Sequence, residues 1–442
     1  MTRPDPGRRN AERVSPDRVL AASILAEVES GRRLDVAWEA SGASAQPGRA
    51  WIRNLVYGTV RLRGRIDHIL SRVAGRDPRD LDPEVRGILR LGVYQILEMG
   101  SVPDYAAVSE SVEQVKGTRR RAAAGLVNAV LRNVVRSRPG EGSFPDPEVD
   151  LEGYLSTWGS HPRWMVRRWV RSFGAEAARA LVEANNREPD VYLRPVGVDP
   201  DAAERALEEA GVAAEGPRRG CSIRLRRGAD PGAALATVPG VIQDPAASLV
   251  VEYASPAPES WVADLCAAPG GKALALSDRV AGVAAADLSL RRVARLVEAR
   301  RRLSARVWPV VADARFPPFR EAPAVLVDAP CSGTGTLRRH PDGRWRVGEA
   351  DIHLLAGVQR SILDGAASMV PRGGLLVYAT CALEPEENWG QVESFLERHP
   401  DFRVEAGAAP GQWLDSNGCL SVLPGRSGFD GAFAARLRRM SR

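Results

Sequence analysis

The sequence has no apolar run long enough to cross a bilayer, few cysteines and almost no lysine. Residues 1–18 are polar and lack the apolar middle of a signal peptide, so we expect a cytoplasmic protein without a membrane partner. The five cysteines are odd in number, widely spaced and without a Cys-x-x-Cys pair, which argues against disulfides and structural zinc. Reduced thiols are the default, which leaves room for a reactive one.

Of the 61 basic residues, only Lys116 and Lys272 are lysines, and a codon bias toward arginine explains this. The net charge of +6 is compatible with a polyanionic partner but does not require one. The five histidines do not gather near the motifs described below, apart from His340, so no metal site is expected.

A chain of 442 residues, 44% of them hydrophobic, is long enough for two or three domains with proper cores. Apolar residues recur at three- and four-residue spacing in the N-terminal third, which indicates helices. From residue 241 onward, Val-rich strands alternate with amphipathic helices, which is typical of a parallel sheet covered on both faces. We expect a disordered tail at 1–14, an all-helical domain at 15–139, a linker at 140–150, a small mixed α/β subdomain at 151–240 and an α/β domain at 241–442.

The first strand of this α/β domain, at 261–265, runs into a turn of small residues and then a helix. The turn comprises Cys266, Ala267, Ala268, Pro269, Gly270, Gly271 and Lys272. Glycines let the backbone approach a ligand, and the following helix N-terminus offers free N–H groups. Neither the Walker spacing nor Gly-x-Gly-x-x-Gly is present, and an ordinary tight turn would also explain two glycines.

Acidic residues close the strands that follow. Asp287 ends the second strand, where a carboxylate can accept hydrogen bonds from ribose hydroxyls. Asp313 ends the third strand and Asp328 the fourth. Each could be a helix N-cap. Because several strand ends meet at one crevice, we instead expect an adenosyl cofactor there.

Two cysteines lie just past neighbouring strand ends: Cys331 after the fourth strand and Cys381 after the fifth. A free cysteine is most often a small buried hydrophobe, but positions at the ligand-binding edge fit that role poorly. A thiolate that adds to C6 of a pyrimidine makes C5 nucleophilic enough to accept a methyl group. In such a site, Asp328 could hold the edge of the base and assist protonation at N3.

Three runs, 264–272, 328–335 and Thr380-Cys381 with 385–388, resemble the Sun/Nop family of RNA cytosine-C5 methyltransferases. The helical region, with 92–97 and 126–132, is similar to a NusB-type RNA-binding domain. The resemblance covers nearly the whole chain. It implies a multidomain fold: an all-α NusB-like domain, then an α/β Rossmann-like class I domain that uses S-adenosylmethionine. The combination resembles family members that act on 16S (small-subunit) ribosomal RNA.

The resemblance also implies roles. Cys381 matches the nucleophile and Cys331 the second cysteine, which assists release of the methylated RNA; DNA cytosine methyltransferases use the Pro-Cys cysteine, so the reverse assignment is the alternative. Residues 266–272, Asp287, Asp313 and Asp328 match positions that bind S-adenosylmethionine. Lys272 can pair with a carboxylate such as Asp328.

Arginines and a tryptophan follow the Cys331 loop, and they suit phosphate contacts and stacking on a base. The expected RNA-binding residues are Arg338, Arg339, Arg344 and Trp345. A solvated charged loop is the other interpretation. We expect a monomer that modifies ribosomal RNA, with transfer RNA as the alternative substrate and a non-catalytic RNA-binding assembly factor as the alternative class.

Overall fold

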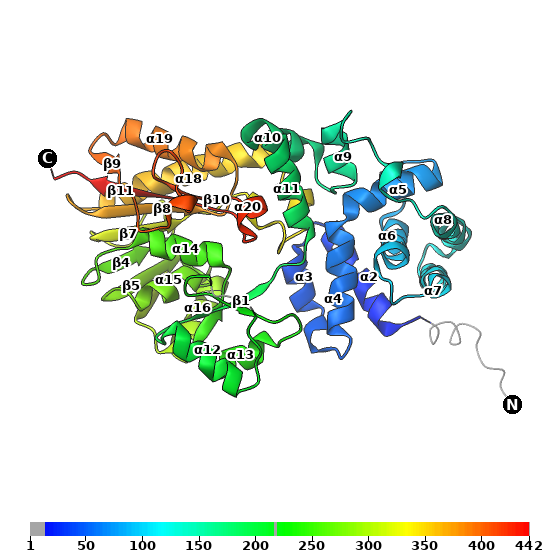
Figure 1. The fold of residues 1–442 in the computed structure, drawn as a ribbon, viewed down its shortest axis with the longest axis horizontal. Helices are drawn as coiled ribbons and strands as arrows, with labels where there is room; N and C mark the ends of the chain where they lie inside the picture. Colours follow the sequence, from blue (N-terminus) through cyan, green and yellow to red (C-terminus); the bar gives the residue numbers. More distant parts are fainter. Residues whose placement is uncertain (1–13, 216–218, 442) are drawn as a thin grey trace. The chain divides into compact units, whose positions relative to one another are not determined.

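The computed structural model describes residues 14–215 and 219–441, which form two compact units (Figure 1). Unit 1 contains the chain up to Arg187 together with Arg339–Arg346. Unit 2 contains Glu188–Arg338 and the chain from Val347 onward. Apart from Val14, the expected tail at 1–14 lies outside the described residues.

Unit 1 is helical. Its helices are α2 (Pro16–Glu29), α3 (Leu34–Ala40), α4 (Arg49–Arg61), α5 (Arg63–Ala74), α6 (Pro83–Glu98), α7 (Asp104–Lys116), α8 (Ala124–Ser137), α9 (Leu151–Thr157), α10 (Arg163–Phe173), α11 (Ala175–Asn186) and α17 (Gly343–Arg346). Helix α6 starts where local chemistry directs it: Pro83 occupies the first turn and the Asp82 side chain accepts a hydrogen bond from Glu84 N. One apolar core contains side chains from helices α2 through α8, and Trp345 packs against it.

The two compact units cut across the subdomain expected at 151–240, whose bounds stay a prediction. Helices α9 to α11 belong to unit 1, where α9 contacts α5, and the boundary falls at residue 187. Only the remainder forms a small sheet in the order β2-β1-β3, built from β1 (Val191–Pro195), β2 (Ile223–Leu225) and β3 (Gly240–Ile242). Helices α12 (Pro200–Glu209) and α13 (Pro231–Thr237) share an apolar core with it.

The large sheet of unit 2 has the order β10-β11-β8-β7-β4-β5-β6, with β9 paired to β11. Its strands are β4 (Trp261–Asp264), β5 (Gly282–Asp287), β6 (Val307–Val311), β7 (Ala324–Asp328), β8 (Leu375–Thr380), β9 (Phe402–Val404), β10 (Leu420–Val422) and β11 (Ala432–Arg439). Strands β4 to β8 run parallel, whereas β11 is antiparallel to β8. The expected fold, a helical N-terminal region followed by an α/β domain, is confirmed.

Helices cover both faces of the large sheet. One core contains side chains of α14 (Pro245–Ala254), α15 (Gly271–Ser277) and α16 (Leu290–Leu303). The core on the other face contains side chains of α18 (Glu349–Met369) and α19 (Trp389–Arg398). Because β4, β5, β7 and β8 are parallel, their carboxyl ends meet at one edge, and that edge carries the candidate site.

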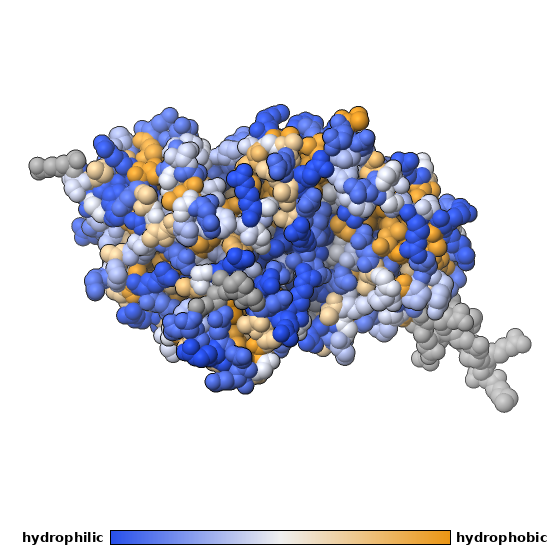
Figure 2. All heavy atoms as spheres, in the orientation of Figure 1, coloured by the Kyte–Doolittle hydropathy of each residue, from blue (hydrophilic) through white to orange (hydrophobic). Residues whose placement is uncertain are grey.

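In the described part of the chain, no helix combines the length and apolar character that a bilayer span requires. On the face shown in Figure 2, apolar side chains lie scattered among hydrophilic ones.

Candidate active site

The loop between β4 and α15 passes close to its neighbours. Gly270 has φ +115°, and a Cβ there would lie 2.4 Å from Leu296 Cδ1 on α16. A Cβ on Gly271 would lie 2.8 Å from Gln243 Nε2. Ala268 N donates a hydrogen bond to Asp287 Oδ2 (3.2 Å), which ties the loop to the end of β5. Glycine is therefore required at Gly270 by both conformation and space.

Two buried acids lie beside this loop. Asp287 accepts from Ser289 N (2.9 Å) and pairs with Arg292 (2.8 Å). Asp264, the last residue of β4, is fully buried, and its Oδ1 accepts from Cys266 N (3.3 Å). Burial, and then the negative charge of Asp328, raises the pKa of Asp264 to about 8.

Asp264 was missed as a site residue by the sequence reasoning. The signal was its position, because it closes β4 as Asp287 closes β5. Within the described residues, its Oδ2 is buried without a hydrogen-bond partner. A buried carboxyl oxygen without a partner beside a glycine turn fits a polar ligand that forms a hydrogen bond with it.

Lys272 and Asp328, both expected at the site, form an ion pair with Nζ 2.6 Å from Oδ2. Burial opposes the charge on Lys272, but the adjacent Asp328 carboxylate outweighs it and the pKa of Lys272 is raised. The lysine is therefore a fixed positive charge that orients the Asp328 carboxylate. Asp313, two residues past β6, instead forms a bidentate pair with Arg315 (2.6 and 3.0 Å), and those hydrogen bonds lower its pKa.

The structure brings the two loop cysteines together: Cys331 Sγ lies 3.2 Å from Cys381 Sγ. This is a hydrogen-bond distance for sulfur, well beyond the ~2.05 Å of a disulfide. The hydrogen bond to Cys381, together with burial, raises the pKa of the Cys331 thiol. The thiol form of Cys331 is thus favoured, and its S–H lies within hydrogen-bonding distance of the Cys381 sulfur.

Backbone contacts hold the two cysteine loops together. Gly335 N donates to Cys381 O (2.9 Å), and Leu383 N donates to Thr334 Oγ1 (2.9 Å). A Cβ on Gly335 would lie 2.6 Å from Cys381 O and 2.8 Å from Gly431 Cα. No side chain larger than glycine fits at residue 335 without separating the loops.

Glu387 is a second residue that the sequence reasoning missed, although it lies within the run 385–388. It is fully buried and accepts from Ser332 N (2.8 Å), Ser332 Oγ (2.5 Å) and Gln359 Nε2 (2.9 Å). Burial raises the pKa of this carboxyl. Because Ser332 directly follows Cys331, Glu387 fixes the loop that carries the protonated thiol.

The RNA contacts expected after the Cys331 loop require a correction. Arg344 is fully buried, because its guanidinium donates to Arg61 O, Ser160 O, Asn185 O and Asn186 Oδ1 at 2.7–3.0 Å. It packs unit 1 and is not available to RNA.

The other three expected RNA contacts differ in exposure. Arg338 is also buried and lies 3.9 Å from Asp244. Trp345 is half-buried, with Nε1 donating to Val60 O (2.9 Å), and Arg339 is half-buried. Of the four, only Arg339 and Trp345 keep partial exposure.

Taken together, the site offers a thiol pair, one member of which holds its proton, beside a carboxylate–ammonium pair. This arrangement suits a thiolate nucleophile with an adjacent proton donor. The neighbouring loop and buried acids form the cradle of a ligand at the carboxyl edge of the sheet.

Comparison with known proteins gives matches over nearly the whole chain. Residues 251–438 match the family described as 16S rRNA methyltransferase RsmB/F, residues 15–136 match the NusB family, and residues 161–230 match an RsmF/B-like ferredoxin-like domain. The chain is 32% identical to ribosomal RNA small subunit methyltransferase B of Cronobacter sakazakii, covering 95% of this chain and 98% of that one. It is 34% identical to the Vibrio cholerae protein of the same name, covering 96% and 97%.

Solved structures share the fold. The protein PH0851 superposes with a TM-score of 0.78 at 24% identity, covering 96% of this chain and 99% of that one. NSun6 from Pyrococcus horikoshii, solved with SFG, gives a TM-score of 0.53 at 20% identity, covering 64% of this chain and 98% of that one.

Proposed function

The chain belongs to the RsmB/F family of 16S rRNA methyltransferases, and from that premise we propose that it methylates C5 of a cytosine in small-subunit ribosomal RNA, with Cys381 as covalent nucleophile and S-adenosylmethionine as methyl donor. The observation that carries the proposal is the 3.2 Å approach of Cys331 Sγ to Cys381 Sγ. Cytosine C5 chemistry needs both a thiolate and a group that exchanges protons next to it.

The reaction follows from the roles of the two sulfurs. The Cys381 thiolate forms a bond to C6, and the electron pair of the C5–C6 bond becomes available at C5. C5 then takes the methyl group, a base removes the C5 proton, and the Cys381–C6 bond breaks to return the thiolate. Cys331 assists this last stage, since its sulfur lies beside the one that leaves.

Asp328 acts on the pyrimidine ring rather than on the sulfur. Its carboxylate is oriented by Lys272 at 2.6 Å and lies at the end of β7, three residues before Cys331. A carboxyl group held in this way can bind the base edge and support protonation at N3 when Cys381 adds. This lowers the charge that develops on the ring.

The residues of the β4–α15 loop fit S-adenosylmethionine, which supplies an electrophilic methyl group. Gly270 and Gly271 leave room for close approach to the backbone, and Asp264 Oδ2 is a buried carboxyl oxygen without a hydrogen-bond partner among the described residues. We assign Asp287 to the ribose hydroxyls, because it lies at the end of β5. Asp313 is assigned to the adenine or amino group, a role in which it would exchange its contact with Arg315.

The test is methyl transfer from tritiated S-adenosylmethionine to small-subunit ribosomal RNA and, separately, to transfer RNA. Cys381→Ala should lose all label, whereas Cys331→Ala should trap an RNA–protein adduct on a denaturing gel. Cys221→Ala, a cysteine outside the pair, is the control and should behave as wild type.

Three other results would contradict parts of the proposal. Adduct in Cys381→Ala instead would reverse the cysteine roles. Label in transfer RNA alone would change the substrate. No label in either RNA despite cofactor binding would overturn the enzyme and leave an RNA-binding assembly factor.

A further inference from the structure

Unit 1 contains a pocket of about 490 Å³ that no part of the methyl-transfer chemistry uses. Its lining combines charged and apolar side chains: Leu25, Val28, Glu29, Thr59, Val60, Arg63, Arg86, Arg90, Asp342, Trp345 and Arg346, with Gly31 and Gly87. Four of these side chains are guanidinium groups. The volume falls in the range of pockets that hold small ligands, about 300–1,000 Å³.

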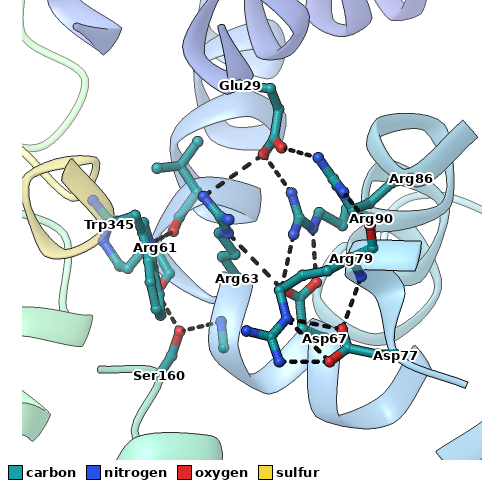
Figure 3. Close-up of polar contacts among 12 residues, drawn as sticks. Glu29, Arg61, Arg63, Asp67, Asp77, Arg79, Arg86, Arg90, Ser160 and Trp345 are labelled. Carbon is teal, nitrogen blue, oxygen red and sulfur yellow. Dashed lines mark hydrogen bonds and ion pairs between the residues drawn. The ribbon is translucent and has the colours of Figure 1, made fainter. Parts of the chain in front are cut away.

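The arginines differ in how far they are already engaged (Figure 3). Arg90 is buried and forms ion pairs with Glu29 and, at 2.7 Å, with Asp67; Arg86 pairs with Glu29 at 2.9 Å. These contacts neutralise both carboxylates. Arg63, by contrast, lies 3.7 Å from Glu29 and 3.8 Å from Asp67, which are longer than hydrogen bonds.

Arg63 is therefore a donor that a ligand can reach, and Arg346, although it pairs with Asp342 through Nε at 2.8 Å, is the most exposed of the four arginines. The side chains of Arg63 and Arg346 keep 29% and 34% exposure, whereas that of Arg90 keeps 2%. The Arg63 guanidinium lies 5.3 Å from the centroid of the Trp345 ring, and Arg346 directly follows that tryptophan. Leu25, Val28 and Val60 line the same pocket and supply apolar surface.

We propose that this pocket binds one nucleotide of the RNA substrate, with the phosphate on Arg63 and Arg346 and the base against the Trp345 ring and the neighbouring apolar side chains. Guanidinium groups match the geometry of phosphate oxygens, and aromatic faces stack on unpaired bases. The inference rests on the proposed function, because it names a second contact with the same RNA. It also gives Trp345 a role in RNA binding, which the buried Arg344 cannot have.

The experiment measures binding of a labelled small-subunit ribosomal RNA fragment to the full-length protein across a salt series. Arg63→Gln with Arg346→Gln should weaken binding at least about tenfold at ~0.1 M salt and flatten the plot of log K against log salt by about 0.7 per lost phosphate contact. The double control Arg76→Gln with Arg136→Gln, at two exposed arginines outside the pocket lining, also removes two charges and should change affinity less than about twofold.

A second measurement does not depend on the variants. Photo-crosslinking of 4-thiouridine RNA to the wild-type protein should yield adducts on peptides containing residues 59–63 or 343–346. Equal affinity and salt slope in the pocket double variant and in the control double variant, or crosslinks confined to other peptides, would overturn the pocket assignment. Methyl transfer by the wild-type protein separates the two proposals. If only the pocket assignment is wrong, the wild-type protein still methylates the RNA. If the proposed function is wrong, it does not.

Discussion

Replacing Arg344 by methionine should destabilise unit 1 specifically. The side chain is fully buried, and its guanidinium donates four hydrogen bonds, to three backbone carbonyls and the Asn186 side chain. Methionine fills much of the same volume but donates no hydrogen bond. All four oxygens lose their bond from residue 344, but Arg61 O keeps a partner because Ser160 Oγ also donates to it at 2.8 Å, which leaves three oxygens to consider.

The magnitude follows from those three oxygens. Each buried acceptor left without its donor lowers the free energy of unfolding by about 1–3 kcal/mol. Because methionine also removes a charge that was costly to bury, part of this loss is offset. We therefore expect a loss of about 3 kcal/mol. Arg346→Met is the matched control: its side chain is 34% exposed, and Asp342 keeps its hydrogen bond from Leu34 N, so the loss should be smaller than in Arg344→Met.

Hydrogen exchange read by mass spectrometry can assign this loss to one unit, which a single melting curve of a two-unit protein cannot. In Arg344→Met, peptides from α4 and α11 should lose about 100-fold in protection, the equivalent of 3 kcal/mol. Peptides from β4 to β8 should be unchanged. Equal protection in Arg344→Met and Arg346→Met would refute the reasoning, as would a loss confined to the large sheet.

Two further predictions concern buried carboxyls of unit 2. Glu387→Gln puts an amide where Ser332 and Gln359 both donate, so the Cys331 loop should loosen. Turnover should then fall about tenfold, and RNA–protein adduct should accumulate on a denaturing gel. Normal turnover without adduct would contradict this. Burial and Asp328 raise the pKa of Asp264 to about 8, so the folded chain holds a proton there that the unfolded chain releases near pH 4. Asp264 therefore lowers stability as pH rises from about 4 to 8. In cofactor-free Asp264→Asn the free energy of unfolding should decline less steeply between pH 5 and 8, and an unchanged slope would contradict the assignment.

The parallel strands could be predicted because a strand buried on both faces is a continuous apolar run. Strand β11 could not: Arg436, Arg438 and Arg439 suggest an exposed segment, yet β11 pairs with β8, β9 and β10. The reason is local, since Arg436 donates to the carbonyls of Tyr253, Ala254 and Ser255 and is buried. Composition does not distinguish such an arginine from a solvated one.

The same limit explains the site. Strand ends and glycines in sequence predicted which loops gather at the carboxyl edge, and the Lys272–Asp328 pair agrees with that expectation. The 3.2 Å approach of the two sulfurs depends on Gly335 and on Glu387, which act through packing and buried hydrogen bonds. Arg344 was expected at an RNA surface, because sequence shows its charge but not the carbonyls that surround it.

The discontinuity of unit 1 has a consequence for the order in which the protein is made. Its last residues, 339–346, leave the ribosome about 150 residues after residue 187. At about 5–20 residues per second, the N-terminal helices wait roughly 10–30 s for the segment that supplies Arg344. During that interval Ser160 O and Asn185 O lack the donor they have in the finished protein. Unit 1 is therefore complete only after most of unit 2 has been synthesised, and a chain halted before residue 339 leaves the ribosome with its N-terminal unit unfinished.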